Sequence, residues 1–133
     1  MFRYYSGILS FRNDFYHEAA QHLTYALGHT YFCESEPKFV RNKLLILVYL
    51  IPAKMTIGTM PTEKMFVKYP DIADLYKDIV DAVQVGDLAG FDQACFKQQD
   101  RLVRLGTWLA IERVRPIVIR RVFHKVYVFC RLL

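Results

Sequence analysis

Glycine and proline residues divide this sequence into segments of helical length. Gly58, Gly86 and Gly106 each follow a stretch in which apolar residues recur at three- and four-residue spacing. That spacing places apolar side chains on one face of an α-helix, and glycine is favoured just after a helix end. No stretch alternates strictly between apolar and polar residues before a hairpin turn, so we expect no β-strands. The sequence therefore predicts an all-α fold of antiparallel helical hairpins, either a bundle or an α-solenoid.

The turn signals also give approximate bounds for each helix. The predicted helices span residues 1–11, 15–29, 38–55, 61–69, 72–85, 87–105, 107–115 and 116–133. Asp14 and Asp71 are expected to cap the helices that follow them, because a short carboxylate accepts well from the first backbone N–H groups. Pro52 is expected to kink or end the third helix, since it lacks an N–H and clashes with the preceding turn.

The composition is that of a folded domain with more apolar residues than its own core is expected to bury. The 133 residues are 53% apolar and 15% aromatic, which is far from the composition of a disordered chain. The longest apolar run, residues 44–53, lies between Lys43 and Lys54 and is about half as long as a membrane-spanning helix. We therefore expect a buried core helix there, and expect a partner or a further part of the protein to cover the remaining apolar surface.

The cysteines and the first residues point to a reducing compartment. Cys33, Cys95 and Cys130 are odd in number and far apart, which fits neither a disulfide framework nor a zinc site. No basic-then-apolar block with a cleavage site follows Met1. The expected location is cytoplasmic or nuclear.

None of the candidate catalytic or metal-binding patterns survives inspection. His17 and His22 are five residues apart, which turns the second ring about 140° away from the first on a helix, whereas a shared zinc ion needs four. Gly86 and Gly90 flank no phosphate-binding lysine, and no serine stands in a nucleophile elbow. We predict no enzymatic activity, no metal, no cofactor and no small-molecule substrate.

Positive charge gathers at one end of the chain. From Lys97 onwards nine Lys and Arg residues are opposed only by Asp100 and Glu112, in a chain of net charge +5. On one helical wheel Arg113, Arg120, His124 and Arg131 fall within about 20° of each other, with Arg121 and Lys125 beside them. The apolar side chains gather on the far side of that wheel: Ile119, Val122, Val126 and Phe129.

This basic ridge admits three interpretations. It could neutralise the phosphates of RNA or DNA, it could meet an acidic protein partner, or it could be a solvated surface. Binding to a membrane surface is ranked below these, because Tyr127 and Phe129 also fit a packed core. The candidate nucleic-acid or partner surface is therefore Arg113, Arg120, Arg121, His124, Lys125 and Arg131.

Two groups of short motifs resemble PCI-domain proteins of the messenger-RNA-export type. The first group is LVYLIPAKM at 47–55, GTMPT at 58–62 and Lys68-Tyr69. The second is VQVGDL at 83–88 with Phe91, then LAIER at 109–113 and RVFHKVY at 121–127. A signalosome-related member of the same group shows the same likeness, so the sequence leaves the paralogue open.

The resemblance implies a fold, a role and a set of partners. The fold is a tetratricopeptide-like right-handed α-solenoid, the helical part of a PCI domain, with residues 1–133 as one domain that ends before the winged helix. The role is that of a non-catalytic scaffold subunit that couples transcription to messenger-RNA export in the nucleus, at the nuclear pore. Its implied partners are a large scaffold subunit and a small acidic protein of the proteasome-lid type, with RNA or DNA as a further ligand and no membrane. The alternative is a signalosome- or proteasome-lid-related assembly.

Overall fold

The structure, a computed structural model, describes residues 2–28 and 37–132. Within these two ranges all regular secondary structure is α-helical, as the sequence predicts. The helices are α1 (Phe2–Arg12), α2 (Tyr16–Gly28), α3 (Pro37–Thr56), α4 (Glu63–Lys68), α5 (Pro70–Val85), α6 (Leu88–Leu105), α7 (Trp108–Glu112) and α8 (Arg115–Leu132).

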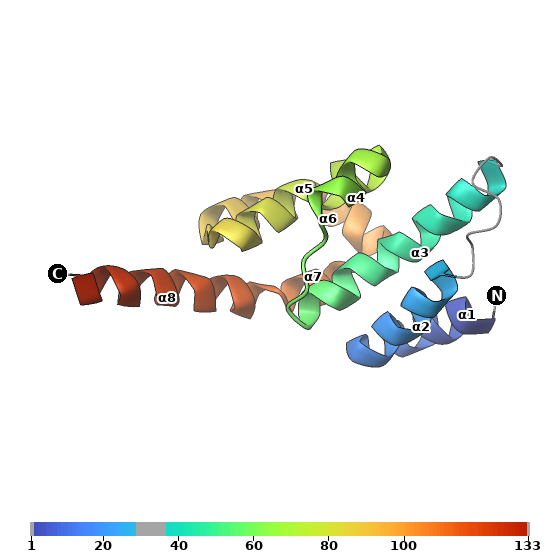
Figure 1. Cartoon of the computed structure of the whole chain (residues 1–133), viewed down its shortest axis with the longest axis horizontal. Helices are drawn as coiled ribbons and strands as arrows, with labels where there is room; N and C mark the ends of the chain where they lie inside the picture. The colour runs from blue at the N-terminus through green and yellow to red at the C-terminus, as the bar shows by residue number, and fades with distance from the viewer. Residues whose placement is uncertain (1, 29–36, 133) are drawn as a thin grey trace.

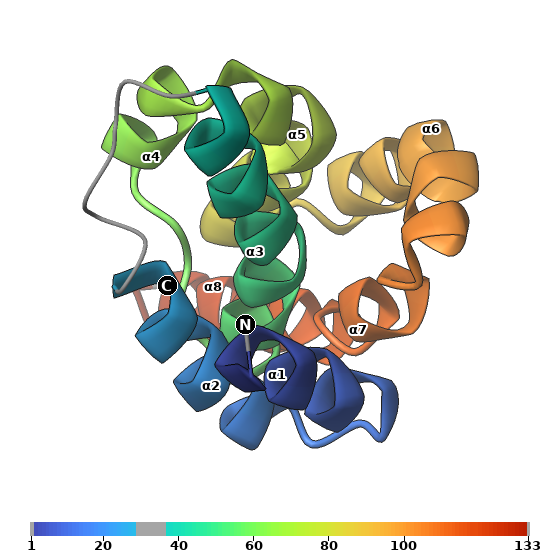
Figure 2. The same ribbon diagram turned by 90° about the vertical axis from the view of Figure 1, so that its right-hand side faces the viewer.

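Consecutive helices pack as neighbours around the long helix α3. Helix α1 packs on α2, and α5 packs on α6, while α3 contacts both pairs. Figures 1 and 2 show α3 between the α1–α2 pair and the α5–α6 pair. Helix α8 contacts α5 and α6 near its start and then extends away from the other helices (Figure 1). The right-handed superhelix and the single-domain assignment for residues 1–133 stay predictions.

The core joins all of these layers. Fully buried side chains come from every long helix except α1, and Leu47, Tyr76 and Leu102 are among the largest. Two tyrosine hydroxyls cross the layers. Tyr76 donates to the Val48 carbonyl oxygen at 2.7 Å, and Tyr49 donates to the Leu105 carbonyl oxygen at 3.0 Å. These bonds join α3 to α5 and to the end of α6.

Helix α3 continues through Pro52 to Thr56. The proline is itself buried, and the flanking residues Ile51, Ala53 and Met55 are buried in the core. Their burial stabilises the last turn and offsets the missing backbone hydrogen bond. The apolar run at 44–53 is therefore part of a core helix, as predicted, and none of the described helices has the length and apolar character to cross a membrane.

Both predicted N-caps are wrong. Asp14 has a φ of 66°, and its carboxylate accepts from the Tyr16 hydroxyl and the Arg113 guanidinium. Helix α5 begins at Pro70 rather than after Asp71, because proline is pre-set for the first helical position. Asp87, where the sequence predicts only that a helix starts, is the N-cap of α6 and accepts from the Gly90 N–H at 3.0 Å.

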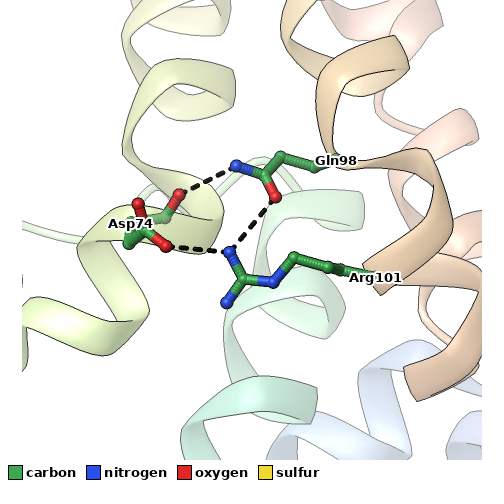
Figure 3. Close-up of polar contacts among 3 residues, drawn as sticks. All are labelled: Asp74, Gln98 and Arg101. Carbon is green, nitrogen blue, oxygen red and sulfur yellow. Dashed lines mark hydrogen bonds and ion pairs between the residues drawn. The ribbon is translucent and has the colours of Figure 1, made fainter.

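A polar cluster fixes the α5–α6 pair that carries α8. The buried Gln98 amide donates to the Asp74 carbonyl oxygen at 3.0 Å. The Arg101 guanidinium donates to the Asp74 carboxylate at 2.8 Å and to the Gln98 amide oxygen at 3.3 Å. Figure 3 shows how the three residues close a ring of contacts between the two helices. The base from which α8 departs is thereby held by polar as well as apolar contacts.

Candidate nucleic-acid or partner surface on helix α8

Helix α8 is anchored by its first two turns. Arg115 donates through Nε and Nη2 to the two carboxylate oxygens of Asp92 on α6, at 3.1 and 3.3 Å. Val118 is the buried side chain of this helix and packs into the core. Arg121 donates from Nη1 to the carbonyl oxygens of Val83 and Gln84, both at 3.2 Å.

The Arg121 contacts lie at the C-terminal end of α5. Carbonyls in the last turn of a helix lack intrahelical partners and carry the negative end of the helix dipole, so a cation is stabilised there. Gly86 closes α5 with a φ of 75°. A Cβ atom on Gly86 would lie 3.2 Å from the Cβ of Arg121. Glycine is therefore needed at this turn both for its conformation and for the close approach of α8.

Beyond this anchor the helix is free. Every residue from Phe123 to Leu132 is exposed, and Figure 1 shows this part of α8 extending beyond the other helices. Tyr127 and Phe129 are 60% and 64% exposed, so the expectation that they fit a packed core is wrong for the part of the chain that the structure describes. No helix of that part reaches them.

Five of the six predicted surface residues share α8, and four of these line one hollow. We call this the basic hollow: a shallow depression of about 420 Å³ lined by Gln84, Arg120, Arg121, His124 and Lys125. Arg131 follows on the same helix, about two turns beyond His124. Helix α8 contains no aspartate or glutamate to balance these charges. Gln84 is a lining residue that periodicity alone could not reveal, because it comes from α5.

Arg113 lies apart from this group. It stands at the end of α7, before the new helix axis begins at Arg115, so the single helical wheel does not apply to it. Its guanidinium is 3.2 Å from the Asp14 carboxylate and 5.2 Å from the centre of the Tyr16 ring. Burial raises the pKa of the Tyr16 hydroxyl to about 12, as does its bond to Asp14, while Arg113 acts in the opposite direction. The positive charge of Arg113 is thus used within the fold.

The histidines and cysteines weighed as candidates have different surroundings. His17 is 3.3 Å from the Gln21 amide, while His22 accepts from Arg3 at 3.0 Å. Burial raises the pKa of the Cys95 thiol to about 12, which opposes formation of a nucleophilic thiolate. Cys33 lies outside the described residues, and Cys130 is exposed on α8. Within those residues no group of three or more metal-ligating side chains comes together.

Comparison with known proteins places the chain in a family. No protein-family model matches it, but several curated proteins do. It is 34% identical over 128 residues to the protein CSN12 homologue of Neurospora crassa. The alignment covers 96% of this chain and 27% of the Neurospora protein. It is 32% identical over 127 residues to the PCI domain-containing protein 2 homologue of Drosophila melanogaster, in an alignment that covers 96% of this chain and 30% of the Drosophila protein. It is also 32% identical over 130 residues to PCI domain-containing protein 2 of Xenopus laevis. That alignment covers 98% of this chain and 31% of the Xenopus protein.

By its sequence, the chain belongs to this family of PCI-domain proteins. The resemblance recognised in the motifs is therefore confirmed. The chain spans about three tenths of the length of the curated relatives it matches. Since the similarity covers nearly all of this PCI-domain chain, most of α8 lies in the shared region.

Proposed function

We propose that this PCI-domain chain is a non-catalytic helical scaffold of a multiprotein complex that couples transcription to messenger-RNA export, and that α8 presents its basic face to nucleic acid. The motifs that resemble the messenger-RNA-export type support the first part, and the names of the relatives support the PCI domain itself. The observation that carries the second part is the basic hollow with Arg131, on a helix without a single carboxylate.

The charge arrangement on α8 suits a polyanion. Phosphate contacts by Lys and Arg dominate affinity for nucleic acids because they release condensed counterions. Arg120, Lys125 and Arg131 are exposed on the same free helix, so a phosphate backbone can approach them without any rearrangement of the core. Arg121 has a double role, since it also holds α8 against the end of α5.

Protein partners are proposed for the apolar side of the same helix. Ile119 and Val122 are half-buried, while Val126 and Phe129 are exposed. Exposed apolar stripes of this kind mark interaction surfaces. The partners that we propose are a large scaffold subunit and a small acidic protein of the proteasome-lid type, in the nucleus at the nuclear pore.

A second candidate function rests on the relatives named CSN12 homologues. In that case the chain serves a signalosome- or proteasome-lid-related assembly and acts through protein contacts alone. The basic hollow would then face an acidic protein surface. The two candidates differ in one property, which is salt-dependent affinity for nucleic acid.

The test is fluorescence anisotropy of a labelled 12-nucleotide RNA titrated with the full chain at several salt concentrations. We expect log affinity to fall linearly with log salt concentration. The triple variant Arg120→Glu, Lys125→Glu, Arg131→Glu should bind much more weakly. If three phosphate contacts are lost, its slope of log affinity against log salt concentration should be smaller in magnitude by about 2. Arg121 is kept so that α8 stays anchored.

A matched control variant reverses the charge of three exposed lysines on other helices. Its substitutions are Lys64→Glu on α4, Lys77→Glu on α5 and Lys97→Glu on α6. It makes the same change in net charge but should retain most of the affinity. Equal losses in the two variants would show that only net charge matters and would contradict a site on α8. Salt-independent or absent binding by the unmodified chain would favour the second candidate function.

A further inference from the structure

Two exposed aromatic rings stand beside the cationic residues of α8. Phe123 is 68% exposed, and Tyr127 is more than half exposed as well. They are four residues apart on a continuous helix, so they share one side and are separated by about 6 Å along the axis. We call this pair the aromatic edge.

The aromatic edge borders the cations directly. At about 100° per residue, Tyr127 lies within about 20° of Arg120 and about 40° of Arg131 around the helix. The Arg131 guanidinium is 6.0 Å from the centre of the Tyr127 ring. Phe123 lies about 60° from Arg120 on the same side. The two rings therefore lie between Arg120 and Arg131 along one side of the helix surface.

The aliphatic side chains of α8 lie beside Phe123 and farther from Tyr127. Ile119 and Val126 lie about 40° and 60° from Phe123 around the helix, but about 80° and 100° from Tyr127. A protein partner could therefore cover these aliphatic side chains and leave the Tyr127 ring in contact with solvent. An occupant that presents both flat apolar faces and negative charge would match the exposed rings and their arginine neighbours.

Single-stranded nucleic acid has both properties. Its bases expose their flat faces, and proteins that bind it combine a cationic track with aromatic side chains on which bases stack. A duplex keeps its bases stacked inside and would offer α8 only its phosphates. The separation of about 6 Å between the two rings leaves room for one base on each ring in an extended strand.

We infer that α8 binds single-stranded nucleic acid, with successive bases stacked on Phe123 and Tyr127 and with phosphates held by Arg120 and Arg131. This inference rests on the proposed function, because it specifies the kind of nucleic acid that the basic surface takes. Stacking on aromatic rings tolerates any base, so the preference is for strandedness rather than for sequence.

The test compares a labelled 12-nucleotide single-stranded RNA with an RNA duplex of the same length, using the full chain at fixed salt. Phe123→Ala and Tyr127→Ala should each weaken single-strand binding roughly tenfold, with the salt slope and the duplex affinity unchanged. Tyr127→Trp should retain the affinity because it keeps a stacking ring. The matched control is Phe96→Ala, which removes a ring that is 78% exposed on α6 and should change nothing.

A second readout detects stacking itself. In a Trp108→Phe background, Tyr127→Trp supplies the one tryptophan of the chain, and its fluorescence should be quenched by the single strand and not by the duplex. Circular dichroism of each variant checks that α8 stays helical.

The outcomes separate this inference from the proposed function. If the alanine variants bind single strands as tightly as the unmodified chain, stacking is excluded while a phosphate-binding surface stands. The same conclusion follows if the unmodified chain binds duplex RNA as tightly as single-stranded RNA. It also follows if the alanine substitutions weaken single-strand and duplex binding equally. Absence of any salt-dependent binding by the unmodified chain would overturn both.

Discussion

The guanidinium of Arg121 donates a hydrogen bond of 3.2 Å to the carbonyl oxygen of Val83. This contact joins the start of the free helix α8 to the end of α5, across the turn at Gly86. The same side chain lines the basic hollow. The direction in which the candidate surface projects therefore depends on a residue that belongs to the surface itself.

Removal of this contact should destabilise the fold. Arg121→Ala is expected to lower the free energy of unfolding by about 1–2 kcal/mol, because hydrogen bonds from a charged donor are strong but this one is partly exposed to water. Urea unfolding followed by circular dichroism measures the change. The adjacent exposed arginine is the control, and Arg120→Ala should stay within about 0.5 kcal/mol of the unmodified chain. Equal effects of the two substitutions would contradict the anchoring role.

The two glycine turns allow conformation and contact to be separated. Gly86→Ala and Gly106→Ala both place a Cβ at a φ between 75° and 79°, which costs about 1 kcal/mol or more. Only at Gly86 would the new Cβ also press on Arg121, since nothing lies within 4 Å of a Cβ at Gly106. We expect Gly86→Ala to lower the unfolding midpoint more. A larger loss for Gly106→Ala would show that α8 does not pack closely on the α5 turn.

The described thiols should differ in reactivity. Burial raises the pKa of Cys95 to about 12, and the Asp92 and Glu112 carboxylates act in the same direction, whereas Cys130 is exposed. In a Cys33→Ser background at pH 8, iodoacetamide should modify Cys130 rapidly and Cys95 slowly, as read by peptide mass spectrometry. In urea the two rates should become similar. Rapid modification of Cys95 in the folded chain would contradict its buried position.

The stability of the chain should decline at alkaline pH. The pKa of Cys95 rises from 9.0 to about 12 on folding and that of Tyr16 from 10.0 to about 12. The folded state therefore binds these protons more tightly, so their contribution is complete below about pH 9 and is lost as the pH rises towards 12. The melting temperature should fall over this range. Cys95→Ala should flatten the first part of the decline, and an unchanged pH profile in that variant would show that the thiol is not protected.

Local signals predicted the helices well because their causes are local. Gly86 and Gly106 end helices in the left-handed conformation that glycine adopts without strain, and Asp87 caps the helix after it. Pro52 could not be resolved from sequence, because the burial that holds the last turn of α3 comes from other helices. The sequence predicts Asp14 as a cap, yet its carboxylate accepts from Arg113, which lies 99 residues further along the chain.

The candidate surface was predictable in composition but not in shape. The charges of α8 can be read from helical periodicity, and five of the six proposed residues share that helix. A single helical wheel groups Arg113 with them, but the break between α7 and α8 places Arg113 on a different helix axis. The freedom of Tyr127 could not be foreseen, since an apolar ring on an amphipathic helix normally packs against a neighbour. Only the arrangement of α5 and α6 shows that none of the described helices reaches it.

The central claim is that nucleic acid binds to α8. Ultraviolet crosslinking of a 12-nucleotide single-stranded RNA to the full chain, followed by peptide mass spectrometry, tests it most directly. Crosslinked peptides are expected from residues 120–131, with Tyr127 as the main site and with loss of the crosslink at high salt. Crosslinks confined to α1–α6, or none at a concentration where anisotropy shows binding, would contradict it.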